Sequence, residues 1–364
     1  MNMNARKNDT SSIHNSELRF FNDKTVFITG HNGFKGSWMC KVLSMAGANI
    51  IGYSLNPPTE PNLFSTINCP NIVSIFGDIR DFETLNSAIL RYKPEIIIHM
   101  AAQPIVRESY KDPITTYSTN VMGTVNILEA ARHCESVKSV LNVTTDKVYE
   151  NLEWEWGYRE TDRLNGIDPY SNSKSCSELI TDAYKRAFLS EIAVSTCRAG
   201  NVIGGGDFAV DRIVPDCVRA ITKCEDILIR NPHSVRAYQH VLEVVFAYLM
   251  VVERQFNDKG YESCYNIGPN EEGCISTERL VRIFCEKWGG SAGWKIAVQK
   301  NAPYESNYLR LDCSRIKNVF HWSALWDITQ AIEKTVEWSK GFSQKADVAE
   351  IMERQICEYK DLYS

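Results

Sequence analysis

Long hydrophobic runs are missing from this 364-residue sequence, and none approaches the ~18 apolar residues of a membrane-spanning helix. Residues 1–19 are polar and lack the apolar core of a signal peptide, so we expect a flexible N-terminal extension on a cytoplasmic protein. With a net charge of −5, the chain also lacks the basic excess of proteins that bind nucleic acids broadly. We therefore expect neither a membrane nor a nucleic acid as a partner.

The twelve cysteines never stand in a CxxC pair, the spacing common to zinc sites and redox motifs. They are scattered along the chain, often within apolar stretches. This distribution is typical of buried, reduced thiols in a cytosolic protein. The sequence therefore predicts no disulfide framework and no metal site.

What the sequence does contain, from residue 24 onward, is an alternation of short β-rich runs and helical stretches. Strands are expected at residues 24–29, 49–54, 72–76, 96–100, 139–144 and 193–198. Helices are expected at residues 34–47, 82–92 and 120–134, and a further long helix should carry Tyr170 and Lys174. Continuous apolar strands between amphipathic helices are the mark of a doubly wound parallel sheet. The predicted fold class is therefore α/β, of the Rossmann type.

A change of pattern after residue 199 indicates a second, smaller domain. Three consecutive glycines and several prolines divide this part of the chain into shorter elements. A helix near residues 240–253 and a strand near 264–267 are expected to return to the large sheet. We therefore assign residues 20–201, with about 238–267, to a dinucleotide-binding domain, and residues 202–237 and 268–364 to a mixed α/β substrate domain.

A glycine-rich turn predicts the cofactor site. The stretch GHNGFKG, residues 30–36, follows a predicted strand and opens a predicted helix. In that context the GxxGxxG spacing brings backbone N–H groups against a pyrophosphate at a helix N-terminus. The candidate cofactor-binding residues here are Gly30, Asn32, Gly33, Phe34 and Gly36.

The end of the second strand favours NAD over NADP. The acidic residue that usually binds the adenosine ribose is missing, since Tyr53 or Ser54 stands at its position. No arginine stands there either, so a 2′-phosphate has no evident partner. We expect NAD, bound more weakly than usual.

Three other strand ends supply further candidates for the cofactor site. Asp78 and Ile79 follow the third strand, where Asp78 either accepts from the adenine amino group or belongs, with Asp81, to a helix N-cap region. Ala101, Ala102 and Gln103 follow the fourth strand, where small residues let a cofactor lie close. Asn120 begins a predicted helix and is either a cap or an amide that orients the site.

The fifth strand and the helix after it carry the predicted chemistry. Tyr170 and Lys174 form YxxxK, which places both on one helix face. An ammonium beside a phenol favours the phenolate and lowers its pKa, so Tyr170 can remove a hydroxyl proton while a hydride leaves the same carbon. Thr145 is placed to share a hydrogen bond at that hydroxyl. Asp146 and Lys147 follow it at the ligand-binding edge of the sheet, where they indicate further proton transfers rather than a surface ion pair.

Taken together, these residues resemble the extended short-chain dehydrogenase/reductase family, and within it the nucleotide-sugar 4,6-dehydratases. The agreement extends along most of residues 20–345, through GHNGFKGSW, GYSLNPPTEPNLF, GDIRD, HMAAQPIVRESY, TNVMGTVNILEA, DPYSNSK, RAGNVIGGGDFA, IRNPHSVRAYQHVLE and YLRLDCS. The Asp-Lys pair is similar to that of the branch acting on CDP-glucose, because the dTDP-glucose branch has Glu in place of Lys147. Departures from the family pattern occur at Phe208, at Ala237 and Tyr238, and at residues 304–307.

The resemblance implies an internal redox dehydration that uses NAD and serves deoxysugar biosynthesis for surface polysaccharide. Tyr170, Lys174 and Thr145 would act at the sugar 4-hydroxyl, Lys147 would remove the C5 proton, and Asp146 would protonate the departing C6 hydroxyl. The nucleotide sugar, CDP-glucose by this resemblance, would contact Asn201, Arg212, Arg236 and Arg310. The resemblance also implies a homodimer formed through the helices near 120–134 and 170–188.

Other functions stay open on the sequence. One alternative is the 4,6-dehydratase of another nucleotide hexose, and a second is a nucleotide-sugar 4-epimerase, which has no need of Asp146 and Lys147. A third is a non-catalytic NAD-binding regulator, although such proteins typically lose the Tyr or Lys of YxxxK, and this chain has both.

Overall fold

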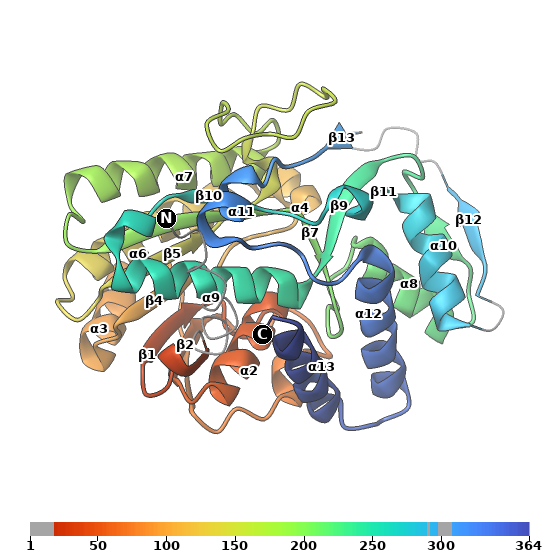
Figure 1. Cartoon of the computed structure of the whole chain (residues 1–364), viewed down its shortest axis with the longest axis horizontal. Coiled ribbons are helices and arrows are strands. Elements are labelled where there is room, and N and C mark those ends of the chain that lie inside the picture. The colour runs from red at the N-terminus through yellow and green to blue at the C-terminus, as the bar shows by residue number, and fades with distance from the viewer. Residues whose placement is uncertain (1–17, 290–291, 298–307, 364) are drawn as a thin grey trace, which may run out of the picture.

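The computed structural model describes residues 18–289, 292–297 and 308–363, and its centre is a seven-stranded parallel sheet (Figure 1). The strand order is β10-β6-β5-β4-β1-β2-β3, which is the order of a doubly wound dinucleotide-binding fold with one extra edge strand. The strands are β1 Thr25–Thr29, β2 Asn49–Ser54, β3 Ile72–Phe76, β4 Ile96–His99, β5 Ser139–Val143, β6 Ala193–Ala199 and β10 Cys264–Ile267. The predicted fold class is confirmed.

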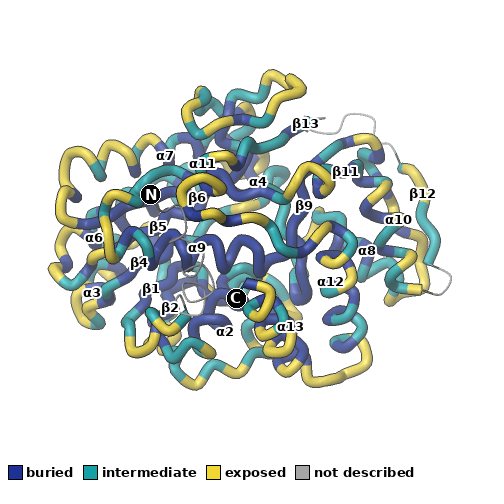
Figure 2. The backbone as a smooth tube through the Cα atoms, viewed as in Figure 1, coloured by how far each residue is buried: buried dark blue, intermediate teal, exposed yellow. Residues whose placement is uncertain are grey.

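Helices cover both faces of this sheet, which is why most of its strand residues are apolar or buried. In β1, Val26 and Ile28 face one hydrophobic cluster and Phe27 faces another, as the alternation of side chains along a strand requires. Helices α2, α9 and α13 contribute to the first cluster, while α3 and α6 contribute to the second. Figure 2 shows that α9 is buried along almost its whole length.

The helices agree with the sequence predictions except at one place. They are α2 Phe34–Met45, α3 Phe82–Tyr92, α4 Val106–Lys111, α5 Pro113–Tyr117, α6 Gly123–Arg132, α7 Pro169–Ala187, α8 Ile213–Thr222, α9 Val241–Asn257, α10 Thr277–Trp288, α11 Ser314–Phe320, α12 Ile328–Ser343 and α13 Val348–Leu362. The helix expected at 120–134 begins later than predicted, because residues Ser118–Met122 form a π-helical turn that joins α5 to α6.

Two smaller sheets lie beyond the carboxyl end of the large one. In the first, β9 Val235–His240 pairs with β7 Asn201–Ile203, β11 Cys274–Ser276 and β13 Tyr308–Leu309. In the second, β8 Ile227–Ile229 pairs with β12 Trp294–Ile296. Helices α8, α10 and α12 pack on these strands around their own hydrophobic cluster. The division into the two predicted domains stays a prediction. Of the extension predicted at residues 1–19, residues 1–17 lie outside the described residues, as does the departure at 304–307. Leu18 and Arg19 are helical and Leu18 packs against the core, so the flexible extension predicted there was drawn two residues too long.

No helix in the described part of the chain has both the length and the apolar character needed to cross a membrane. All twelve cysteines are free thiols.

Glu243 joins three parts of the chain beneath the large sheet. This fully buried side chain in the first turn of α9 accepts hydrogen bonds from the backbone N–H groups of Leu325 and Trp326 and from the hydroxyl of Tyr359. Burial raises the pKa of Glu243 to about 7, although these hydrogen bonds act in the opposite direction. The folded protein therefore binds a proton at Glu243 more tightly than the unfolded chain does.

Replacing this carboxylate should flatten part of the pH dependence of stability. Between a normal glutamate pKa of about 4.5 and a folded value of about 7, the unfolded chain releases its proton first, so wild-type stability falls as the pH rises. We therefore expect the free energy of unfolding of Glu243→Gln, measured relative to that of the wild type, to rise by roughly 2 to 3 kcal/mol from pH 5 to pH 8. Thermal or denaturant unfolding at both pH values measures this difference.

The contribution of the buried histidines cancels in that comparison. His31, for example, has a pKa lowered to about 4 by burial, and it titrates in both proteins. Glu350→Gln, in the first turn of α13, controls for the loss of one surface carboxylate. A difference between Glu243→Gln and wild type that stays constant from pH 5 to 8 contradicts the prediction.

Candidate functional site

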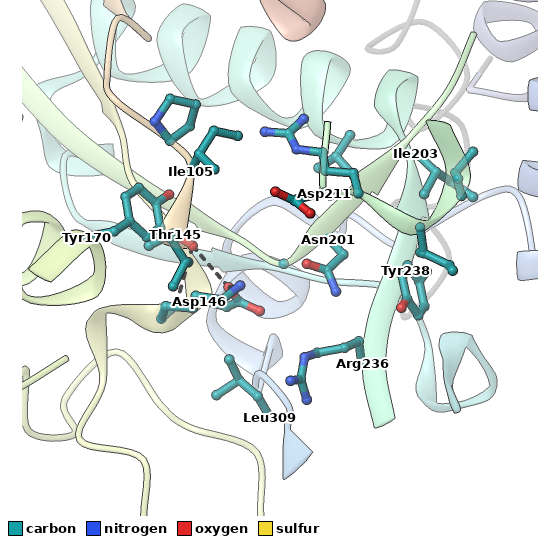
Figure 3. Close-up of a pocket in the computed structure, with 18 of the residues that line it drawn as sticks. Ile105, Thr145, Asp146, Tyr170, Asn201, Ile203, Asp211, Arg236, Tyr238 and Leu309 are labelled. Atoms are coloured by element: carbon teal, nitrogen blue, oxygen red, sulfur yellow. Dashed lines mark hydrogen bonds and ion pairs between the residues drawn. The ribbon is translucent and has the colours of Figure 1, made fainter. Parts of the chain in front are cut away.

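Four of the five predicted catalytic residues, all except Lys174, line one cavity, because two elements end or begin there. Thr145 follows β5 at the carboxyl edge of the sheet, and α7 begins at Asp168, whose side chain accepts from the backbone N–H of Ser171. Tyr170 therefore lies in the first turn of α7. These residues line a cavity of about 370 Å³. Figure 3 shows Thr145, Asp146 and Tyr170 on one side of the cavity, with Arg236 and Tyr238 on the other.

Thr145, Asp146 and Lys147 contact one another directly. The hydroxyl of Thr145 donates to Oδ1 of Asp146 at 3.0 Å, and Nζ of Lys147 lies 3.8 Å from the same oxygen. Asp146 is almost fully buried, whereas the Lys147 side chain is partly exposed to the cavity. An acid and a basic amine therefore stand side by side next to Thr145, an arrangement suited to moving two protons on one bound molecule.

Tyr170 and Lys174 both have pKa values shifted by burial. Burial raises the pKa of Tyr170 to about 12, although a hydrogen bond with Thr145 partly opposes this. Burial, followed by the nearby charge of Lys35, lowers the pKa of Lys174 to about 8. The expected lowering of the Tyr170 pKa by Lys174 is not met in this structure: burial raises this pKa, and the groups that act in the other direction are Thr145 and Arg212. The Lys174 ammonium instead donates to the carbonyl oxygen of Val143 at 3.2 Å.

A buried ion pair holds α7 against the strand end behind the cavity. Arg198 on β6 donates to both carboxylate oxygens of Glu178 on α7, at 3.0 and 2.9 Å. The hydroxyls of Thr196 and Thr144 donate to the same carboxylate. Hydrogen bonds and the arginine lower the pKa of Glu178 in spite of its burial. Thr144 directly precedes Thr145, so this network sets the position of the catalytic strand end.

The glycine-rich turn has the geometry that a dinucleotide pyrophosphate needs. Gly30 has a φ of +73°, and a Cβ there would lie 2.9 Å from Cα of Ala101. Gly33 is the N-cap of α2 and supplies no side-chain cap, so the first-turn N–H groups stay available to an anion. Asn32 donates to the carbonyl of Leu55 and steadies the turn. The turn therefore fits a bound NAD.

The remaining cofactor candidates have mixed positions. Asn120 accepts from the backbone N–H of Gln103 and donates to Ser173 of α7, so it orients the site rather than capping a helix.

The carboxylate of Asp78 is held by Arg80, while Asp81 caps α3. The buried Ile79 packs next to Gly123. Ala101, Ala102 and Gln103 follow β4, as expected, and the N–H of Ala101 donates to Thr29.

The substrate candidates divide into two groups. Asn201, Arg212 and Arg236 line the cavity. Arg310 is not among the lining residues, and its guanidinium contacts the hydroxyl of Tyr308 and the carboxylate of Glu271. The structure therefore brings three of the four predicted substrate contacts together with the catalytic residues.

The cavity also has charged residues that the sequence did not single out. Asp211 lies 3.7 Å from Arg107 and 2.6 Å from Arg230, linking α4 to the end of β8. Lys35, inside the glycine-rich motif, also lines the cavity. The sequence contains no motif that predicts the contacts of Asp211, whereas the position of Lys35 within the glycine-rich motif could have singled it out. Among the described residues, no cluster of His, Cys, Asp or Glu suits a metal ion.

Comparisons with known proteins agree with this arrangement. CDP-glucose 4,6-dehydratase from Salmonella typhimurium is 43% identical over 352 residues, which cover 94% of this chain and 98% of that protein. A dTDP-glucose 4,6-dehydratase from Bacillus anthracis, solved with NAD, superposes with a TM-score of 0.75 at 22% identity, covering 89% of this chain and 98% of that one. A UDP-glucose 4-epimerase from Thermus thermophilus, also solved with NAD, superposes with a TM-score of 0.76 at 22% identity, covering 87% of this chain and 99% of that one.

The model of the GDP-mannose 4,6 dehydratase family matches residues 27–335. This match spans the large sheet, the glycine-rich turn, the catalytic strand end and most of the smaller sheets. The chain therefore belongs to the GDP-mannose 4,6 dehydratase family.

Proposed function

We propose that this protein is a CDP-glucose 4,6-dehydratase, which converts CDP-D-glucose into CDP-4-keto-6-deoxy-D-glucose and water. The observation that carries the proposal is the placement of Asp146 and Lys147 beside Thr145 and Tyr170 in one cavity. Similarity to the Salmonella enzyme along almost the whole chain supports the choice of substrate.

The glycine-rich turn and the first turn of α2 would hold NAD. When bound, NAD⁺ accepts a hydride from the sugar and later returns it to the same molecule, so the cofactor is regenerated in each turnover. Gly30, Gly33 and Gly36 would let the chain approach the pyrophosphate, and the uncapped N–H groups at the start of α2 would be available to it. Asn120 fixes the loop at Gln103 against α7.

Tyr170 would take the proton of the sugar 4-hydroxyl. A phenol with a pKa of about 12 needs a stabilised phenolate for this task. Lys174 is charged at neutral pH, since its pKa is about 8, and its position one helical turn away supplies a positive charge. Thr145 contributes a hydroxyl hydrogen bond to Tyr170.

Lys147 and Asp146 would carry out the elimination of water. A ketone at C4 acidifies the proton at C5, and Lys147 would remove it. Asp146 would donate a proton to the departing C6 hydroxyl, and its side chain lies in the cavity wall beside Lys147. A 4-epimerase needs neither step, so the presence of both side chains in the cavity argues for the dehydratase over that alternative.

Asn201, Arg212 and Arg236, which line the cavity, would bind the nucleotide diphosphate. The product class, a 4-keto-6-deoxy sugar nucleotide, suits the synthesis of deoxysugars for surface polysaccharide such as the lipopolysaccharide O-antigen. Twelve free cysteines suit a reducing compartment, and we place the enzyme in the cytoplasm.

Substrate choice and reaction type can be tested together. CDP-, dTDP-, GDP- and UDP-glucose are offered separately, with and without added NAD⁺, and loss of one water is followed by mass spectrometry. We expect water loss with CDP-glucose, at a rate that added NAD⁺ raises if retention is weak. A change of sugar configuration at C4 without loss of mass would instead assign an epimerase, and a preference for another nucleotide would assign the related dehydratase.

Removing the proposed base should slow the elimination. We expect Lys147→Ala to reduce the rate of water loss about a hundred- to ten-thousandfold, the range for removal of a general base. In D₂O the wild-type product should carry deuterium at C5, and the variant should incorporate it correspondingly more slowly. Lys111→Ala, an exposed lysine paired with Glu108, is the matched control. A normal rate of water loss in Lys147→Ala contradicts the assignment.

We also propose a homodimer formed through the outer faces of α5, α6 and α7. Exposed apolar side chains lie on these contacting helices or directly beside them: Ile114 on α5, Met122 in the turn before α6, Leu179 on α7 and Phe188 just after α7. A face of this kind is typical of a protein–protein interface. We expect Leu179→Arg to convert the dimer into a monomer in sedimentation experiments. Leu362→Arg, at an equally exposed leucine in the last turn of α13, should stay dimeric, and an unchanged mass in Leu179→Arg excludes this interface.

A further inference from the structure

Lys35 is a cation of the cavity wall to which neither the predicted chemistry nor the substrate contacts assign a role. It is the second residue of α2 and lies beside Phe34 in the wall. Its side chain therefore enters the same space as Thr145, Asp146 and Tyr170.

The other cations of the cavity wall all have a protein partner. Lys147 contacts Asp146, Arg107 and Arg230 contact Asp211, Arg212 contacts Asp207 and Arg236 donates to the carbonyl of Val235. Lys35 differs from them, because within residues 18–289, 292–297 and 308–363 its amine makes no hydrogen bond and no ion pair. Since a long side chain loses conformational entropy when it is ordered in a wall, an unpaired amine there needs an explanation.

The surroundings of this amine are unfavourable to a positive charge in several independent ways. The first turn of α2 contains no acidic residue, and a cation at that end of a helix opposes the helix dipole. Burial and the charge of Arg212 lower the pKa of Lys35 to about 8, and Lys35 in turn lowers that of Lys174. Asp146 alone acts in the other direction. The positive charge of Lys35 is therefore unfavourable in the free protein, and it lies in a cavity wall, where a bound ligand can offset this unfavourable free energy.

We propose that the amine of Lys35 binds a phosphate group of the nucleotide ligand, between the first turn of α2 and the loop that carries Arg212. This inference rests on the proposed function, since it concerns the same cavity. The partner must be an anion, because a neutral sugar hydroxyl cannot offset the repulsion among Lys35, Arg212 and Lys174. A phosphate oxygen is the anion common to the sugar nucleotide and to the dinucleotide cofactor, and it makes charge-assisted hydrogen bonds to lysine.

The phosphate contact proposed for the Lys35 side chain differs in position from the contacts that the backbone of the glycine-rich turn can make. The N–H groups of α2 lie along the start of the helix, whereas the Lys35 amine lies within electrostatic reach of Asp146 and Arg212 inside the cavity. Lys35 would thus add a side-chain contact to a phosphate, and its charge would be offset only when the ligand is bound.

Calorimetric binding to Lys35→Gln, Lys35→Arg and wild type tests the proposal without turnover. Two ligand pairs are used: CDP with cytidine, and ADP-ribose with adenosine. We expect Lys35→Gln to weaken one phosphate-containing ligand about ten- to a hundredfold, the range for a hydrogen bond between charged groups. Its phosphate-free partner should bind unchanged, and Lys35→Arg should restore most of the affinity. Loss confined to CDP assigns the contact to the sugar nucleotide, and loss confined to ADP-ribose assigns it to the dinucleotide.

The thermal stability of the ligand-free protein provides the second measurement. Because the lone amine is a cost in the free protein, Lys35→Gln should unfold at the same temperature as wild type or higher, while its stabilisation by the affected ligand should be smaller. A structural lysine would give the opposite result, a less stable free protein with unchanged ligand affinity. Lys287→Gln, a lysine of α10 paired with Glu333 outside the cavity wall, controls for the loss of one charge.

Several outcomes overturn the inference. Unchanged affinity of Lys35→Gln for both CDP and ADP-ribose removes the phosphate contact, and the proposed function survives if the wild type still releases water from CDP-glucose. An equal loss for cytidine or adenosine also overturns it, since the effect then does not involve phosphate. A wild type that binds neither CDP nor ADP-ribose overturns the inference and the proposed function together.

Discussion

The ion pair between Arg198 and Glu178 is the contact on which the active-site geometry depends. It joins α7, which carries Tyr170 and Lys174, to β6 in the interior of the sheet. Burying two charges costs free energy, and here paired hydrogen bonds from the guanidinium and donations from Thr144 and Thr196 offset that cost. This ion pair fixes the position of α7 along the strand end, so that the phenol of Tyr170 and the hydroxyl of Thr145 meet.

Much of the fold could be predicted because its signals are local. The run KTVFIT predicted a strand at 24–29, and β1 is Thr25–Thr29. Such runs are apolar throughout because helices cover both faces of the sheet, and turn residues bound them on each side. The meeting of Thr145 with Tyr170 was also predictable, since parallel strands and the helices that follow them share one edge of the sheet.

The rest depends on contacts between segments distant in the sequence. Arg310 looked like a phosphate ligand, but Tyr308 and Glu271 hold its side chain. The carboxylate of Asp78 allowed two interpretations until Arg80 was seen to bind it. Lys35 stands in a helical stretch, where a lysine normally faces solvent, and only the tertiary structure places it in a cavity wall. Burial likewise reversed the expected pKa shift of Tyr170, because desolvation depends on the whole surrounding structure.

The strand order also has a consequence for the synthesis of the chain. Edge strand β10, Cys264–Ile267, pairs with β6 only after β7, β8 and β9 have been made. A nascent chain that ends before residue 264 therefore presents the unpaired backbone edge of β6 to its surroundings, and such edges pair readily with other chains. The large sheet therefore stays open at this edge until synthesis has passed residue 267, and a chain truncated before that point is exposed to aggregation.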